Sequence, residues 1–109
     1  MPHPSPSENI YEYLERLKTA MNTPYVYAVI GNEVVSPLRG SVEPDIANLV
    51  VRTGLSTIRS LDFADEVELE PAGLEGKLYI KKVGKGHVIV FKPLRKGNGL
   101  VFEEVIMEE

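Results

Sequence analysis

Cysteine and glutamine are both absent from the 109-residue sequence, and histidine occurs only twice. A chain without cysteine can form no disulfide, and it has neither a thiolate nucleophile nor a cysteine-ligated metal site. The two histidines, His3 and His87, lie far apart in the sequence. Because cysteine and glutamine are thermolabile, their absence suggests that the protein comes from a thermophile.

Long hydrophobic runs are also missing. The longest apolar stretch, residues 25–30, is far too short to span a bilayer, which takes about 20 residues. Residues 1–6 have neither the basic start nor the apolar core of a secretory signal. The formal net charge of −4 argues against a dedicated nucleic-acid-binding protein, because the partner would be densely negative. We therefore expect a cytoplasmic protein.

The rest of the composition is typical of one folded domain. Hydrophobic residues make up 43% of the chain and charged residues 26%, which is ordinary for a globular protein. The length is close to the commonest size of a single domain. We expect residues 1–109 to form one domain, with the proline-rich residues 1–6 as a flexible lead-in.

A first helix is expected directly after the lead-in. Ser5 can cap it, Pro6 suits the first helical position, and Glu8 completes a capping box. Pro24 ends it, because proline disfavours helical geometry at the residue before it. Apolar residues recur between these limits at helical spacing, namely Ile10, Tyr13, Leu14, Leu17 and Met21.

Short β-prone runs account for most of the remaining chain. Gly31-Asn32 and Gly84-Lys85-Gly86 each separate two such runs, which predicts tight hairpins. Residues 88–91 are continuously apolar, as in a central strand. Residues 100–107 fit a short helix and a strand equally well. The predicted strands cover residues 25–30, 33–36, 67–70, 78–83 and 87–91.

The order of these elements predicts the fold class. Every link between successive strands of a hairpin is short, which demands antiparallel pairing. We expect an α+β fold in the order α-β-β-α-β-β-β, with a five-stranded antiparallel sheet and helices packed on it.

The second helix, expected from about Glu43 or Pro44 to Leu61, has more apolar residues than one sheet face requires. A helix covering a sheet needs an apolar stripe of roughly 100°. Val51 and Leu55 widen the stripe beyond this, so we expect a partner for the surplus. Gly54 would permit the close approach of another helix. The main stripe comprises Ile46, Leu49, Val50, Ile58 and Leu61.

Four segments resemble the roadblock family, the small domains named after the dynein light chain roadblock, in their archaeal or bacterial form. They are the hairpin Val26 to Val35, the long second helix, Glu66-Val67-Glu68-Leu69-Glu70 leading to Gly76-Lys77-Leu78-Tyr79-Ile80, and Gly99-Leu100-Val101, which is similar to the start of the family's last helix. These are patterns of apolar residues and turns, and profilin-like and longin-like folds share a similar layout.

The resemblance implies a non-enzymatic dimerisation module. Such domains pair through the second helix and the following strand, and they scaffold or regulate small Ras-like GTPases. On this basis we expect a homodimer whose interface contains Val51, Gly54, Leu55, Val67 and Leu69.

Seven of the twelve basic residues lie between residues 77 and 96, interleaved with Tyr79 and Phe91. Three interpretations are open: a solvated sheet face, a docking patch for an acidic protein through Lys81, Lys82 and Lys85, or a surface that binds nucleic acid by phosphate contacts and base stacking. The basic residues are Lys77, Lys81, Lys82, Lys85, Lys92, Arg95 and Lys96.

The sequence offers little for catalysis. His87 has no second histidine or His-x-x-Glu spacing beside it. The segment 84–87 lacks the Gly-x-x-x-x-Gly-Lys-Ser/Thr pattern of a phosphate loop and joins two strands. The acidic residues of 62–70 alternate with apolar ones, as on a solvent-facing side, although Glu66, Glu68 and Glu70 would also share one face toward a cation. We expect no catalytic residue, cofactor or metal.

Two other functions are open beside the dimeric interaction module. One is a ligand- or nucleic-acid-binding module that uses residues 77–96, and the other is an unrecognised enzyme.

Overall fold

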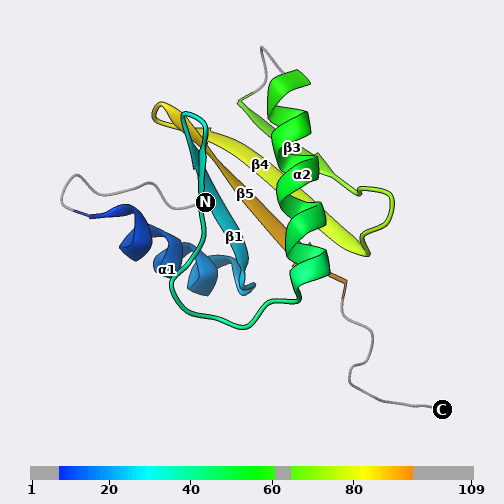
Figure 1. The fold of residues 1–109 in the computed structure, drawn as a ribbon, viewed down its shortest axis with the longest axis horizontal. Helices are drawn as coiled ribbons and strands as arrows, with labels where there is room; N and C mark the ends of the chain where they lie inside the picture. The colour runs from blue at the N-terminus through cyan, green and yellow to red at the C-terminus, as the bar shows by residue number, and fades with distance from the viewer. Residues whose placement is uncertain (1–7, 61–64, 95–109) are drawn as a thin grey trace.

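The computed structural model describes residues 8–60 and 65–94, which form two helices and a five-stranded sheet (Figure 1). The expected terminal element at residues 100–107 lies outside the described residues. The elements in chain order are α1 (Ile10–Met21), β1 (Tyr25–Ile30), β2 (Glu33–Val35), α2 (Pro44–Ser60), β3 (Glu66–Leu69), β4 (Gly76–Val83) and β5 (Gly86–Pro93).

All neighbouring strands pair antiparallel, in the order β2-β1-β5-β4-β3. This confirms the predicted α+β class and element order. The apolar strand β5 is central, as predicted, with β1 and β4 on its two sides. Both predicted hairpins are present, and Gly31 and Gly84 take the positive φ angles of 62° and 59° that their turns require. The edges of the sheet are β2 and β3.

The two helices cover opposite faces of the sheet, because successive side chains of a strand point to opposite sides. On the face that α1 covers, Leu14 and Leu17 pack against Val26 and Val90. On the face that α2 covers, Val50 packs in a core with Ile89. These are called the α1 face and the α2 face. Neither described helix is long and apolar enough to cross a membrane.

The capping prediction for α1 was wrong by one turn. The N-cap is Asn9, whose side chain accepts the backbone N–H of Glu12 at 2.9 Å, and the Glu12 carboxylate accepts the N–H of Asn9 at 3.0 Å. This is the capping box that Ser5 and Glu8 were expected to form. At its other end, α1 stops at Asn22, which is left-handed with φ 57°.

Candidate interaction surfaces

The helix α2 packs against the sheet through the middle of its own length. Only Val50 and Gly54 of its 17 residues are fully buried, while the apolar residues beside them are half-buried. It packs mainly against β5, β4 and β1. In the view of Figure 1 it crosses in front of β3. Each flank of α2 therefore keeps apolar surface exposed, as the width of its apolar stripe predicted.

Gly54 is not at an outer surface, contrary to expectation. A Cβ atom added there would collide with the side chain of Ile89 in β5, so the glycine lets α2 approach its own sheet closely. The close approach predicted from this glycine is real, but the neighbour is the central strand of the same chain.

Val51 and Leu55 lie on the flank of α2 that faces away from β3. Ala47 on this flank lines a small cavity with Tyr27 of β1 and Pro37, so the flank faces β1 and the chain after β2. Val51 and Leu55 follow Ala47 at spacings of four residues and continue the same ridge. The structure therefore does not bring them together with the β3 residues of the predicted interface.

The flank of α2 toward β3 carries Leu49 and Thr53, both half-buried. Leu49 lies about 100° to one side of Val50 and Val51 about 100° to the other, because each residue turns the helix by that angle. On β3, Val67 and Leu69 are half-buried on the same face of the sheet. These four residues, Leu49, Thr53, Val67 and Leu69, with the free edge of β3, form the β3-edge surface. The sequence could not identify Leu49 and Thr53, because both flanks of α2 carry apolar residues.

The free edge of β3 presents the backbone groups of Glu66 and Glu68. Lys82 donates its backbone N–H to the Asp65 carbonyl at 2.7 Å, so Asp65 points its backbone inward to β4. The direction alternates along an antiparallel strand. The backbone N–H and C=O groups of Val67 and Leu69 therefore also point inward to β4. Those of Glu66 and Glu68 point away from the sheet.

The side chains of Glu66 and Glu68 share the α1 face with Lys77 and Lys81 of β4. Glu66 lies directly across from Lys81, and the Glu68 carboxylate forms an ion pair with Lys77 at 3.2 Å. This hydrogen bond to Glu68 raises the pKa of Lys77.

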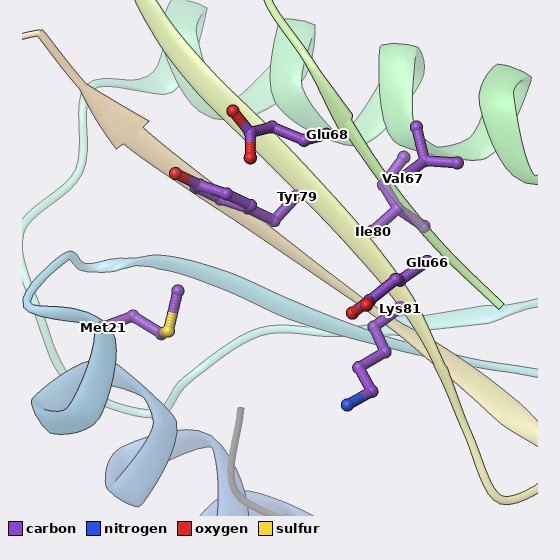
Figure 2. A pocket seen from close by; sticks show the side chains of 7 residues that line it. All are labelled: Met21, Glu66, Val67, Glu68, Tyr79, Ile80 and Lys81. Carbon is purple, nitrogen blue, oxygen red and sulfur yellow. The ribbon is translucent and has the colours of Figure 1, made fainter.

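The charged side chains border a shallow hollow of about 350 Å³ between β3, β4 and Met21 at the end of α1 (Figure 2). Tyr79 lies in this hollow, whereas Val67 and Ile80 point away from it (Figure 2). The hollow is open and carries charges of both signs at its margin.

The predicted basic patch is divided by the sheet. Lys77 and Lys81 are on the α1 face, whereas Lys82 lies across from His87 on the α2 face, and Lys85 is in the exposed turn between β4 and β5. Phe91 is only 1% exposed and belongs to the core, so it is not available to stack on a base. The interleaved lysines and aromatics therefore do not form one surface, and Arg95 and Lys96 lie outside the described residues.

His87 is half-buried near the start of β5. Burial, and secondarily the charge of Lys82, lower its pKa. Within residues 8–60 and 65–94, no three histidine, aspartate or glutamate side chains are grouped closely enough to hold a metal ion.

Comparison of the chain with family models, with curated proteins and with solved structures finds no match.

Proposed function

We propose that the protein is a non-enzymatic, homodimeric interaction module of the roadblock type, which regulates or scaffolds a small Ras-like GTPase. The observation that carries the proposal is the β3-edge surface. An unpaired strand edge lies there beside half-buried apolar side chains of both β3 and α2.

A second copy fits this surface in its backbone hydrogen-bonding pattern and its apolar side chains. Antiparallel pairing of two β3 strands would satisfy the outward N–H and C=O groups of Glu66 and Glu68 and extend the sheet across both chains. The same approach would bring α2 of each copy together on one face of the joined sheet. Leu49, Val67 and Leu69 would then lose their remaining contact with water, which favours association.

The GTPase part of the proposal rests on the resemblance, and the exposed lysines supply a candidate contact. Lys82 and Lys85 are exposed at the end of β4 and in the β4–β5 turn, and Lys82 lies beside the start of β3, because its backbone N–H donates to the Asp65 carbonyl. Lys81 belongs to the opposite face and is a separate candidate. Loss of binding to a Ras-like GTPase of the same organism in Lys82→Glu and Lys85→Glu variants, with the dimer intact, would support this contact. Equal binding by these variants would exclude it.

The dimer is tested by light scattering at micromolar concentration, which should report about twice the 12.1 kDa mass of the chain. Leu49→Asp should give a monomer, because the new carboxylate would be buried without a partner. Leu55→Asp is the matched control: it makes the same substitution at another half-buried leucine, on the opposite flank of the helix, and should remain dimeric. A wild-type monomer contradicts the proposal. A dimer that only Leu55→Asp disrupts would place the interface on the flank first expected from the sequence.

A further inference from the structure

The acidic side chains of β3 constrain what can pair with its free edge. The backbone groups that point outward belong to Glu66 and Glu68, and the side chains of the same two residues lie on the α1 face. An antiparallel partner that satisfies this edge must align its own outward-pointing residues with these glutamates. In a second copy those residues are again Glu66 and Glu68.

Every such register places carboxylates opposite each other. If Val67 of one copy faces Val67 of the other, Glu66 faces Glu68 twice. If the strands slide by two residues along each other, Glu66 faces Glu66 or Glu68 faces Glu68. Like charges directly opposite on neighbouring strands destabilise the pairing.

Two lysines of β4, Lys77 and Lys81, reduce this repulsion without removing it. Lys77 holds Glu68 by an exposed ion pair, and Lys81 lies across from Glu66 on the inner side. Both lysines are one strand further from the edge than the glutamates. The partner strand would therefore meet the carboxylates first.

We propose that Glu66 and Glu68 select the partner of the β3 edge by charge. The edge pairs weakly and reversibly with a second copy of itself, and it pairs more strongly with an antiparallel strand that carries lysine or arginine at the two facing positions. This inference rests on the proposed function, because it assumes that the β3 edge is the pairing surface.

Neutralising one carboxylate tests the repulsion directly. Glu66→Gln should lower the dissociation constant of the homodimer about three- to tenfold, as expected for relieving two facing pairs. Glu33→Gln is the matched control, because Glu33 is an exposed glutamate on β2, the other edge of the same sheet. Sedimentation equilibrium should show a change of less than about twofold for the control. Equal effects of the two variants would overturn the inference, since only the net charge would then matter.

A charge-reversed copy of the same chain tests the choice of partner. The Glu66→Lys/Glu68→Lys chain, checked for folding by circular dichroism, is mixed with wild type, and the dimers are counted by native mass spectrometry. Mixed dimers should exceed the half that random pairing gives, and a random distribution would overturn the inference. Should this variant fail to fold, the glutamine comparison still decides.

The two proposals fail in different ways. A wild-type dimer that Leu49→Asp disrupts, with an unchanged dissociation constant for Glu66→Gln, would leave the proposed function standing and remove the charge selection. Monomers in wild type and in every glutamate variant would remove both. Dimers that form only after a β3 glutamate is neutralised would support the charge selection and contradict the proposed homodimer of the wild-type chain.

Discussion

Two tyrosines of β1 point into the same core but differ in what their hydroxyl groups meet. The Tyr25 hydroxyl accepts the backbone N–H of Glu43 at 3.1 Å, just before α2 begins. The Tyr27 hydroxyl is buried and has no hydrogen-bond partner among the described residues. Burial, with a smaller contribution from Tyr25, raises the pKa of Tyr27 to about 12.

Removal of the two hydroxyls should therefore have different effects. Tyr25→Phe should lower the free energy of unfolding by about 1 kcal/mol, because it leaves the Glu43 N–H without its acceptor. Tyr27→Phe should be neutral or stabilising, because it removes a buried polar atom that gains nothing in return. Urea unfolding followed by circular dichroism measures both. A larger loss for Tyr27→Phe than for Tyr25→Phe would contradict the assignment.

Gly54 gives a second prediction at this scale. Alanine in the middle of a helix is normally better than glycine by about 1 kcal/mol. At this position we expect the opposite sign, because the added methyl group collides with Ile89 and overpacking costs about 1–3 kcal/mol. Ile89→Val in the same chain should recover part of the loss in a double-mutant cycle. Increased stability of Gly54→Ala alone would show that α2 does not approach β5 this closely.

His87 should make stability depend on pH. Its pKa is lowered from 6.5 in the folded protein, so the folded state binds fewer protons than the unfolded state near that pH. The stability present above pH 6.5 is therefore partly lost as the pH falls through the folded pKa. NMR titration should place the His87 pKa lower than 6.5. Lys82→Gln should raise it only partly, because burial is the larger cause, and Lys81→Gln on the opposite face should have little effect.

At the scale of elements, the sequence predicted the strands and hairpins because their signals are local. Glycines mark the turns after β1 and β4, and the apolar run of β5 marks the central strand. The start of α1 was harder, because Ser5 with Glu8 and Asn9 with Glu12 both have the spacing of a capping box. The apolar periodicity begins at Ile10, directly after the cap that the structure uses.

The residues of the proposed β3-edge surface could not be found from local signals. The apolar stripe of α2 predicted a surplus, but Leu49 and Leu55 are equivalent until the position of β3 relative to the helix is known. Sequence alone also could not show how the basic region is arranged in space. Lysines that are close in sequence on β4 alternate between the two faces, so sequence proximity overstated how close together they lie.

For the whole molecule, the arrangement of layers leaves the two edge strands of the described sheet as the places where another strand could pair. Each helix covers one face, and the sheet order places β2 and β3 at opposite ends. The edge strand β2 has only three residues and is followed by Pro37, both of which limit pairing with another chain. β3 has four residues, and it has apolar neighbours on α2. It carries the acidic side chains of Glu66 and Glu68. Edge strands commonly use such charges to prevent unwanted association.

The last prediction concerns how association and folding are coupled. If dimerisation through the β3-edge surface stabilises the fold, the melting temperature of the wild type should rise with protein concentration, since mass action favours the folded dimer. Leu49→Asp should remove this dependence while leaving the circular dichroism spectrum of the folded chain. Val50→Asp should abolish folding at every concentration. Val50 is fully buried between α2 and the sheet, and a lone carboxylate there would have no partner. Differential scanning fluorimetry over a hundredfold range of concentration measures all three. A wild-type melting temperature that does not change over this range would mean that the chain folds as a monomer and that the free edge of β3 does not support its stability.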